Sequence, residues 1–272
     1  MEPSLASVLA APDPSGPGFD RAALARVWPL FALTVSTPRL VLRVPTDADL
    51  VRLANVAADI HAPGARPLTA PWTDRQGIDR EQALLQHHWE ARASWSPARW
   101  SLDLGVWHEG ELVGVQTVRA HDFAVRRTVQ TASWLHRSRQ GAGVGTEMRR
   151  AALHLAFAGL GAQRAETEAH ESNLASLTVT NRLGYRPNGD DLRIDAHGRR
   201  RVLRFVLDVD DRPPDLGADV VIQGLEPCRP LLGAAVGLRE GVELHLLQLT
   251  LGVSIDPPGL SLPFLPQLPF GL

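Results

Sequence analysis

The chain has 272 residues, of which 44% are hydrophobic and 21% are charged, a balance that is typical of globular proteins. Its formal net charge of -2 provides no basic field for nucleic acid, and no polybasic stretch is present to hold an anionic membrane surface. The composition therefore argues against a nucleic-acid partner and against a membrane partner.

All 28 basic residues are arginine, and this excludes every chemistry that depends on a lysine amine. P-loop nucleotide hydrolysis, protein-kinase activity and Schiff-base catalysis are among them. The single cysteine, Cys228, excludes an intramolecular disulfide and a zinc site built from several cysteines. The adjacent pair His87 and His88 lacks the spacing of a zinc-binding helix. We expect a cytoplasmic protein without a metal site.

The composition changes at both ends of the chain. Residues 1–27 contain several prolines and glycines and no apolar core of a signal peptide, so we expect a flexible leader in which residues 21–27 add at most a helical turn. Residues 28–211 have the pattern of one folded domain. Residues 212–272 form a Pro/Leu-rich extension, for which we expect a short strand near 220–222 and a poorly ordered end.

The first half of the domain predicts strands and helices in alternation. A strand covers residues 39–44, and Thr46 with Asp49 predicts the capped start of a helix that continues to about residue 58. Helical spacing recurs over residues 79–93. Strands at 102–107 and 112–118 flank the turn dipeptide Glu109-Gly110 and predict a hairpin, and a third strand covers 129–135.

The second half continues this alternation. A helix is predicted over residues 146–160, a strand over 164–170, a second helix over 174–182, and a final hairpin from 192–194 and 202–207 around His197-Gly198. Such a pattern indicates a layered α/β or α+β domain rather than a helix bundle.

A glycine-rich loop separates the strand at 129–135 from the helix that follows it. Gly141, Gly143 and Gly145 lack a Cβ atom, so the backbone can bend tightly and present N–H groups to an anion at the start of the helix. A tight turn without a ligand is the alternative. A Rossmann fingerprint does not fit, because the sixth positions from Gly141 and Gly143 are Thr146 and Met148.

The remaining pattern is Q-x-x-G-x-G, spelled by Gln140, Gly143 and Gly145. It resembles the pyrophosphate-binding motif of the GNAT superfamily of acyl-CoA N-acyltransferases. The segments 173–176 and 181–185 are similar to the Asn-x-x-Ser segment of that family and to the junction that closes its helix. The resemblance covers about residues 28–208, including the order of the elements.

Further short segments refine this resemblance. Trp134-Leu135 before the loop and the opening at 37–43 are typical of the branch of ribosomal-protein alanine N-acetyltransferases. The segments 28–31 and 228–231 resemble an actinobacterial, and thus bacterial, subgroup that includes succinyl-CoA users. The implied fold is the α/β (α+β) GNAT fold, in which helices flank a mostly antiparallel mixed sheet with splayed middle strands.

The resemblance also implies which residues bind CoA and which act on the thioester. Ser176 is the implied donor to the leaving thiolate, and Asn173 is implied to fix the pantetheine amide. The full set of implied CoA-binding residues is Trp134, Leu135, His136, Arg137, Gln140, Gly141, Ala142, Gly143, Val144, Gly145, Thr146 and Asn173.

The implied reaction transfers an acyl group, acetyl by default, from acetyl-CoA to a primary amine of a protein N-terminus, a lysine or a small molecule. Gln130 stands where related sequences often carry a carboxylate, and an amide cannot take a proton at neutral pH. The candidates to replace that base through water are His121, Asp122, Glu168 and His170. An amine in its neutral fraction also reacts without a base.

Several alternatives stay open at this level. Succinyl-CoA as donor requires a cation near the acyl end, for which Arg119, His121, Arg126 and Arg127 are candidates. Trp72, Trp89, Trp95 and Trp100 line an acceptor pocket, pack in the core, or form a contact of a homo-oligomer. The loss of the base at Gln130 also fits a catalytically silent CoA-binding sensor, and the apolar tail fits a non-enzymatic oligomer.

Overall fold

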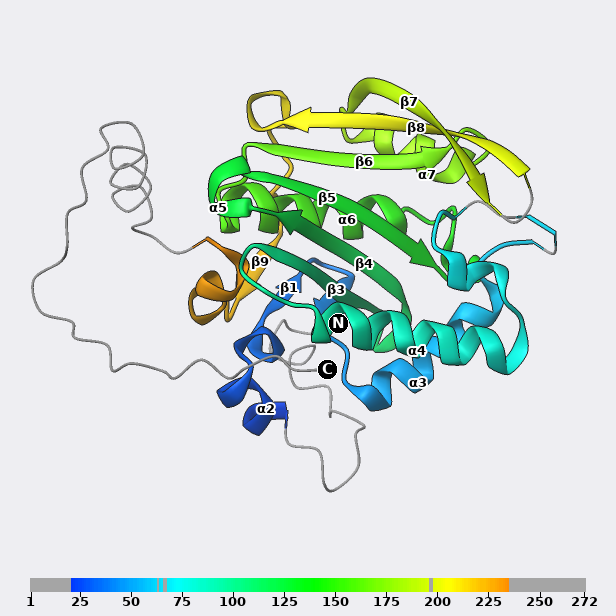
Figure 1. Cartoon of the computed structure of the whole chain (residues 1–272). Helices are drawn as coiled ribbons and strands as arrows, with labels where there is room; N and C mark the ends of the chain where they lie inside the picture. Colours follow the sequence, from blue (N-terminus) through cyan, green and yellow to red (C-terminus); the bar gives the residue numbers. More distant parts are fainter. Residues whose placement is uncertain (1–20, 63, 66–67, 196–197, 235–272) are drawn as a thin grey trace, which may run out of the picture. The chain divides into compact units, whose positions relative to one another are not determined.

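The computed structural model describes residues 21–62, 64–65, 68–195 and 198–234, all of which belong to one compact unit. Its centre is a nine-stranded sheet with the strand order β7-β8-β6-β5-β4-β3-β2-β1-β9 (Figure 1). Neighbouring strands run antiparallel except for β5 and β6, which are parallel. The predicted fold class, a mostly antiparallel mixed sheet flanked by helices, is confirmed.

The elements have the following bounds. The strands are β1 (Thr34–Ser36), β2 (Leu40–Arg43), β3 (Arg99–His108), β4 (Glu111–His121), β5 (Thr128–Leu135), β6 (Arg164–His170), β7 (Arg186–Asp195), β8 (Gly198–Asp208) and β9 (Val221–Gln223). The α-helices are α2 (Arg21–Val27), α3 (Asp47–Val56), α4 (Gly77–Ala93), α5 (Phe123–Arg126), α6 (Val144–His154) and α7 (Leu174–Arg182). A π-helical turn continues α6 over Leu155–Gly159, and a 3-10 helix, η7, covers Glu226–Leu232.

Local sequence signals fix several element ends as predicted. Thr46 caps α3 by accepting a hydrogen bond from the Asp49 N–H, while the Asp49 carboxylate accepts one from the Thr46 N–H. The hairpin of β3 and β4 turns at Glu109 and Gly110, which both have positive φ. The short strand β1 was not predicted, because three residues carry too little periodicity.

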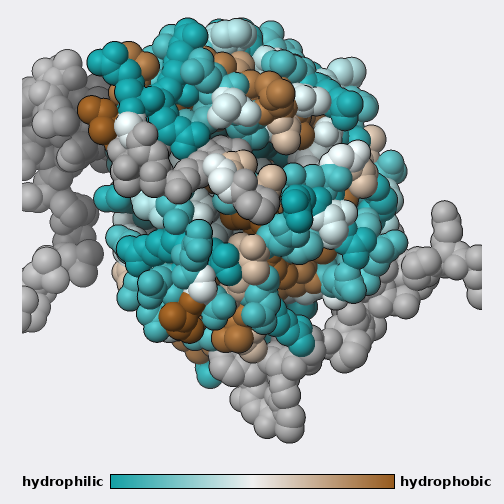
Figure 2. Space-filling view, turned by 90° about the vertical axis from the view of Figure 1, so that its right-hand side faces the viewer, coloured by the Kyte–Doolittle hydropathy of each residue, from teal (hydrophilic) through white to brown (hydrophobic). Residues whose placement is uncertain are grey.

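Helices cover both faces of the sheet. The face that we call the α6 face packs against α6, with Val129 and Leu135 of β5 among the buried contacts. The opposite face, the α4 face, carries α3 and α4, and a separate apolar cluster there includes Leu50, Leu84 and Val115. In Figure 1 α4 lies in front of the sheet and α6 lies behind it. Figure 2, turned by 90°, shows that hydrophilic residues cover most of that side of the described surface, with smaller hydrophobic patches between them.

Both predicted ends of the domain need correction. Residues 21–27 form the helix α2 rather than part of a flexible leader. Residues 212–234 belong to the domain, because β9 pairs with β1 and because the indoles of Trp95 and Trp100 donate hydrogen bonds to the carbonyls of Leu231 and Leu232. The rest of the predicted leader, residues 1–20, and the predicted poorly ordered end, residues 235–272, lie outside the described residues.

Candidate active site

The middle strands of the sheet separate along their length. β5 and β6 pair from Thr128 and Arg164 as far as Thr131 and Thr167, where the pairing ends. The two strands lie together on the left of Figure 1 and diverge toward the right. A cavity of about 630 Å³ lies at this divergence, between the end of β5, the glycine loop, α6 and α7. This volume is in the range of small-molecule sites.

The backbone of β5 presents alternate residues to the cavity. The Trp134 carbonyl lies against Gly114 of β4, where an added Cβ atom would come within 2.2 Å of it, and the His136 N–H donates to the Val113 carbonyl. Because backbone groups alternate along a strand, those of Ser133 and Leu135 face the opening. The predicted backbone contacts to the cofactor arm therefore belong to alternate residues, and the backbone of Trp134 and His136 is directed to β4.

The glycine loop ends in the start of α6. Gly143 is the residue before the helix and has a φ of 81°, a left-handed conformation that favours glycine. The first N–H groups of a helix have no acceptor within it, and no side chain caps this helix start. Gly145 and Thr146 of this first turn line the cavity, and the Thr146 N–H already donates to the Gly143 carbonyl at 3.1 Å. The loop and the N–H groups before Thr146 have the geometry of an anion site.

Side chains around the loop hold it in place. The Gln140 amide donates to the carbonyls of Leu135, at 3.0 Å, and of Ile60, at 2.8 Å. Arg137 pairs with Asp59 at 3.0 Å, and Arg139 pairs with Glu111 at 2.5 Å. Both arginines are thus compensated by carboxylates.

A further clamp on the loop was missed by sequence reasoning. Glu147 in the first turn of α6 accepts a hydrogen bond from the Thr37 hydroxyl at 2.6 Å and pairs with Arg39, whose guanidinium also donates to the Ala142 carbonyl. These contacts tie the connection between β1 and β2 to a segment more than 100 residues away. No local sequence pattern predicts these contacts.

The start of α7 forms another wall of the cavity. Asn173 caps this helix by accepting a hydrogen bond from the Ser176 N–H at 3.1 Å, and both residues line the cavity. Ser176 is half-buried there. The two residues predicted to act on the thioester are therefore brought to the same space as the end of β5.

Most of the predicted cofactor-binding and catalytic residues line this one cavity. They are Trp134, Leu135, Arg137, Gln140, Gly141, Gly143, Gly145, Thr146, Asn173 and Ser176. His136 and Ala142 are not among the lining residues, and Val144 is buried in the core of the domain. Arg149 lines the cavity and was not predicted. The sequence pattern that could have identified Arg149 is its position among apolar residues on the buried face of the helix, next to Met148.

The residues weighed as a general base lie elsewhere on the sheet. Gln130 accepts a hydrogen bond from Arg119 at 3.1 Å and donates one to Glu166 at 3.4 Å. Burial raises the pKa of the Glu168 carboxyl, but the two hydrogen bonds from Arg193, each 2.6 Å, outweigh it and the pKa is lowered. A carboxylate held in this way is a weak base at neutral pH. His121 and Asp122 lie at the end of the β3–β4 hairpin, and none of these candidates lines the cavity.

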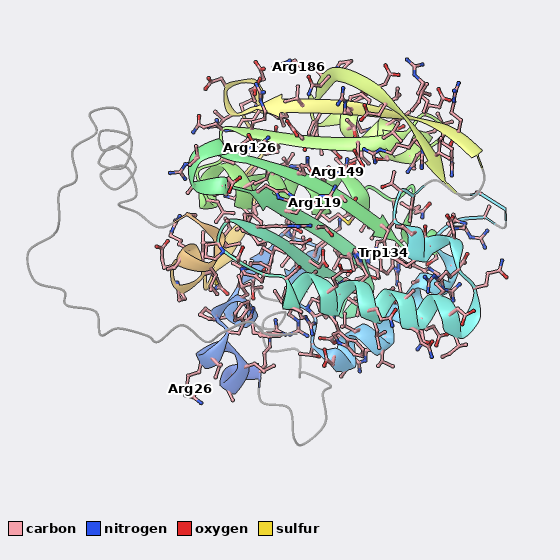
Figure 3. The ribbon with its side chains drawn as sticks, in the orientation of Figure 1. Arg26, Arg119, Arg126, Trp134, Arg149 and Arg186 are labelled. Atoms are coloured by element: carbon pink, nitrogen blue, oxygen red, sulfur yellow. The ribbon has the colours of Figure 1, made fainter. Side chains whose placement is uncertain are left out.

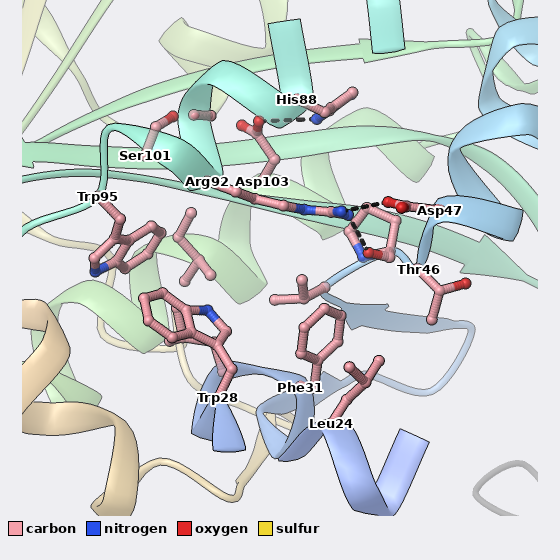
Figure 4. Close-up of a pocket in the computed structure, with 15 residues that line it drawn as sticks. Leu24, Trp28, Phe31, Thr46, Asp47, His88, Arg92, Trp95, Ser101 and Asp103 are labelled. Carbon is pink, nitrogen blue, oxygen red and sulfur yellow. Dashed lines mark hydrogen bonds and ion pairs between the residues drawn. The ribbon is translucent and has the colours of Figure 1, made fainter. Parts of the chain in front are cut away.

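A second pocket lies on the α4 face of the domain. It has a volume of about 340 Å³, and its walls include Trp28, Phe31 and Trp95 (Figure 4). At its margin His88 and Asp103 form a buried hydrogen bond of 2.9 Å, with the imidazole Nδ1 against the carboxylate.

The four tryptophans weighed as an acceptor pocket do not line the larger cavity. Trp72 packs edge-to-face on Trp134 at 5.7 Å, and Trp95 stacks with Trp100. Trp89 is 46% exposed. Core packing therefore accounts for Trp72 and Trp100, whereas Trp95 is also a wall of the second pocket.

Neither a metal site nor a membrane span is found in the described part of the chain. Among those residues, no group of three or more His, Cys, Asp or Glu side chains is arranged to hold an ion. No helix in the same part is long and apolar enough to cross a bilayer. Burial raises the pKa of the Cys228 thiol to about 11, so this cysteine is not a thiolate nucleophile at neutral pH.

Comparison with known proteins accords with this geometry. The model of the acetyltransferase (GNAT) domain matches residues 39–186. Among solved structures, RimL, a ribosomal L7/L12 alpha-N-protein acetyltransferase in complex with coenzyme A, superposes with a TM-score of 0.52 at 17% identity, over 64% of this chain and 96% of that one.

Two other solved structures show the same fold. Mycobacterium smegmatis RimJ in complex with CoA-disulfide has a TM-score of 0.53 at 22% identity, over 70% of this chain and 92% of that one. The microcin C7 self-immunity acetyltransferase MccE in complex with acetyl-CoA and AMP has a TM-score of 0.52 at 16% identity, over 63% and 93%. With its splayed strands, its glycine loop and the matched family model, the chain belongs to the GNAT acetyltransferase family.

Proposed function

We propose that the protein transfers an acyl group, acetyl by default, from acyl-CoA to a primary amine of a protein N-terminus, a lysine or a small molecule. One observation carries this proposal. The glycine loop, the cavity-facing backbone of Ser133 and Leu135, and the pair Asn173 and Ser176 all border the same cavity of about 630 Å³ between diverging strands.

The residues present fit a CoA thioester. The start of α6 and the loop offer N–H groups to a pyrophosphate, the space at Gly141 is open, and the Arg39 guanidinium lies 3.4 Å from where a Cβ atom at Gly143 would be. The cavity-facing N–H and carbonyl groups of β5 suit the amides of a pantetheine arm. When bound, the thioester supplies the activated acyl group.

The chain itself contributes position and hydrogen bonds rather than a covalent intermediate. Holding the donor in an extended conformation between the strands raises its effective concentration for an incoming amine. The Ser176 hydroxyl is our candidate for the hydrogen-bond donor to the departing thiolate. The Asn173 side-chain oxygen caps α7, which fixes the orientation of its amide in the wall of the cavity.

The test is calorimetric titration of the full chain with acetyl-CoA and with CoA. We expect saturable binding that Gly143→Val abolishes. Gly110→Val is the matched control, because Gly110 has the same φ of 81° and lies in the β3–β4 turn with open space around it. Binding that survives Gly143→Val, or that Gly110→Val removes equally, contradicts the assignment of the loop.

Turnover separates an enzyme from a CoA-binding sensor. With an amine acceptor found by screening, Ser176→Ala should lower kcat by about 100-fold, as for the loss of a positioned proton donor, while the Kd for CoA changes little. Gln130 at the position of the missing carboxylate favours the sensor as a second candidate. Tight CoA binding without turnover on any amine would support that candidate.

A further inference from the structure

A charged side chain is buried in the wall of the cavity. Arg149 projects from α6, is 3% exposed, and is among the residues that line the cavity. Its guanidinium donates to the hydroxyls of Ser133, at 3.0 Å, and of Thr180, at 3.1 Å. Figure 3 labels this side chain between the sheet and α6. It therefore bridges β5, α6 and α7 through two neutral groups.

No negative charge compensates this cation in the described part of the chain. None of the ion pairs there includes Arg149, and its Nε atom is buried without a hydrogen-bond partner. Burial lowers the pKa of the guanidinium and Tyr185 opposes this shift, with no carboxylate taking part. An arginine side chain nevertheless remains protonated. A buried charge that contacts only hydroxyls lowers the stability of the folded state, so a role other than stability would explain its presence.

The position of Arg149 along the cavity points to that reason. The glycine loop stands at one end, where Gln140 contacts the Leu135 carbonyl. Ser133, the partner of Arg149, lies two residues deeper, toward the point where β5 and β6 rejoin at Thr131. A thioester whose pyrophosphate is held at the loop would have its acyl end toward the deep end of the cavity, on the side where Arg149 lies.

The other arginines do not compete for this role. Those on the loop side pair with carboxylates, as Arg137 does with Asp59. Arg119, weighed earlier for an acyl carboxylate, contacts Gln130 outside the cavity, and Arg126 is an exposed residue of α5 (Figure 3). Arg182 lines the cavity from the exposed end of α7.

We propose that Arg149 recognises a carboxylate at the end of the acyl chain, so that the preferred donor is a dicarboxylic acyl-CoA such as succinyl-CoA. This inference rests on the proposed function. A guanidinium has five N–H groups, of which two are used by Ser133 and Thr180, so donors remain for a carboxylate oxygen. Pairing also supplies the compensating charge that the cavity wall lacks.

The experiment compares acyl donors by calorimetry on the full chain. Charge-assisted hydrogen bonds predict that the wild type binds succinyl-CoA about 10- to 100-fold more tightly than acetyl-CoA. Arg149→Met should bring this ratio to about 1 while the Kd for acetyl-CoA changes less than about twofold. Arg149→Lys, which keeps the charge, should retain part of the preference. Arg126→Met removes an exposed arginine outside the cavity and should retain all of it.

The outcomes are distinguishable from failure of the proposed function. If the wild type binds neither thioester, the CoA site itself is wrong. If it binds both equally, or if Arg149→Met keeps the preference, donor selection by Arg149 is wrong while the CoA site stands. If Arg149→Met binds both as the wild type does but has a lower kcat with each, the charge acts in the transition state and donor selection is again overturned. The ratio of the wild-type Kd values for acetyl-CoA and succinyl-CoA tests the donor preference even if a variant fails to fold.

Discussion

Two buried polar clusters occupy opposite faces of the same sheet and differ in their balance of charge. On the α4 face the Asp103 carboxylate accepts hydrogen bonds from His88, at 2.9 Å, and from Thr117, at 2.7 Å. On the α6 face Arg149 contacts only the hydroxyls of Ser133 and Thr180. Asp103, Thr117 and Ala132 are in register, so Ser133, the next residue, faces the other side.

The comparison shows the difference between a buried charge that is stabilised by partners within the protein and a buried charge that has no counter-charge there. Burial raises the pKa of the Asp103 carboxyl, but the hydrogen bonds and charge of His88, with Thr117, outweigh it and the pKa is lowered. In that cluster the carboxylate has two hydrogen-bond donors and α4 is tied to β3 and β4, while the His88 Nε2 atom is buried without a hydrogen-bond partner. The Arg149 cluster leaves a charge without a counter-charge beside a cavity, as expected of a site whose partner is a substrate.

The largest effect should follow from breaking the Asp103 cluster. Asp103→Asn removes a buried carboxylate that accepts two hydrogen bonds, and at about 1.5–3 kcal/mol for each hydrogen bond to a charged group we expect the free energy of unfolding to fall by about 3–5 kcal/mol. Urea denaturation measures it. Asp47→Asn is the control, since Asp47 pairs with Arg92 at 57% side-chain exposure and its loss should cost less than about 1 kcal/mol. Equal losses would show that the Asp103 cluster is not a special source of stability.

A smaller effect is expected from Thr117→Val. It removes one hydrogen bond to a buried carboxylate at nearly constant volume, which corresponds to about 2 kcal/mol. Thr128→Val is the matched change on β5, where the hydroxyl bonds to the Arg126 carbonyl at an exposed position. A loss no larger than that of Thr128→Val, again by urea denaturation, would count against the hydrogen bond to Asp103.

The Arg149 cluster should respond with the opposite sign. Arg149→Met replaces an uncompensated buried cation by an apolar side chain, so we expect the free energy of unfolding to stay the same or to rise by about 1 kcal/mol. Thermal and urea unfolding of the ligand-free protein measure it. A loss as large as that of Asp103→Asn would make Arg149 a structural residue and erase the contrast between the two faces.

The pH dependence of stability sharpens the comparison further. Because the pKa of Asp103 is lowered in the native state, the unfolded chain binds more protons near the ordinary value of 3.8. The stability due to Asp103 is therefore complete above that value and is lost as the pH falls through the native pKa. The gap between wild type and Asp103→Asn should narrow from pH 7 to pH 3, whereas a constant gap would exclude this linkage.

Short-range patterns made much of this architecture predictable. The capping pair Thr46 and Asp49, the turn at Glu109 and Gly110, and the glycine loop before α6 are signals in which the chemistry and the structure lie within a few residues. For the same reason the cavity-lining loop residues and the pair Asn173 and Ser176 were found by resemblance to a motif.

What escaped prediction depends on contacts between distant segments. Arg39 meets Glu147, and Trp100 meets the carbonyl of Leu232, across more than 100 residues each. The cation for an acyl carboxylate was sought at Arg119 of β4 and at Arg126 of the β4–β5 connection, because strand order alone does not reveal that an arginine of α6 lines the cavity. The register within the sheet and the rotation of the helix determine which side chains line the cavity, and a local sequence pattern predicts neither of them.

The pairing of β9 with β1 has a practical consequence for shortened forms of the protein. β9 is the outermost strand on its side of the sheet, so a chain ended at residue 211 would leave the N–H and carbonyl groups of β1 without a neighbour. Unprotected strand edges recruit strands from other molecules. Such a chain would keep every residue of the cavity and still be prone to self-association, because the three residues of β9 that cover the edge of β1 would be missing.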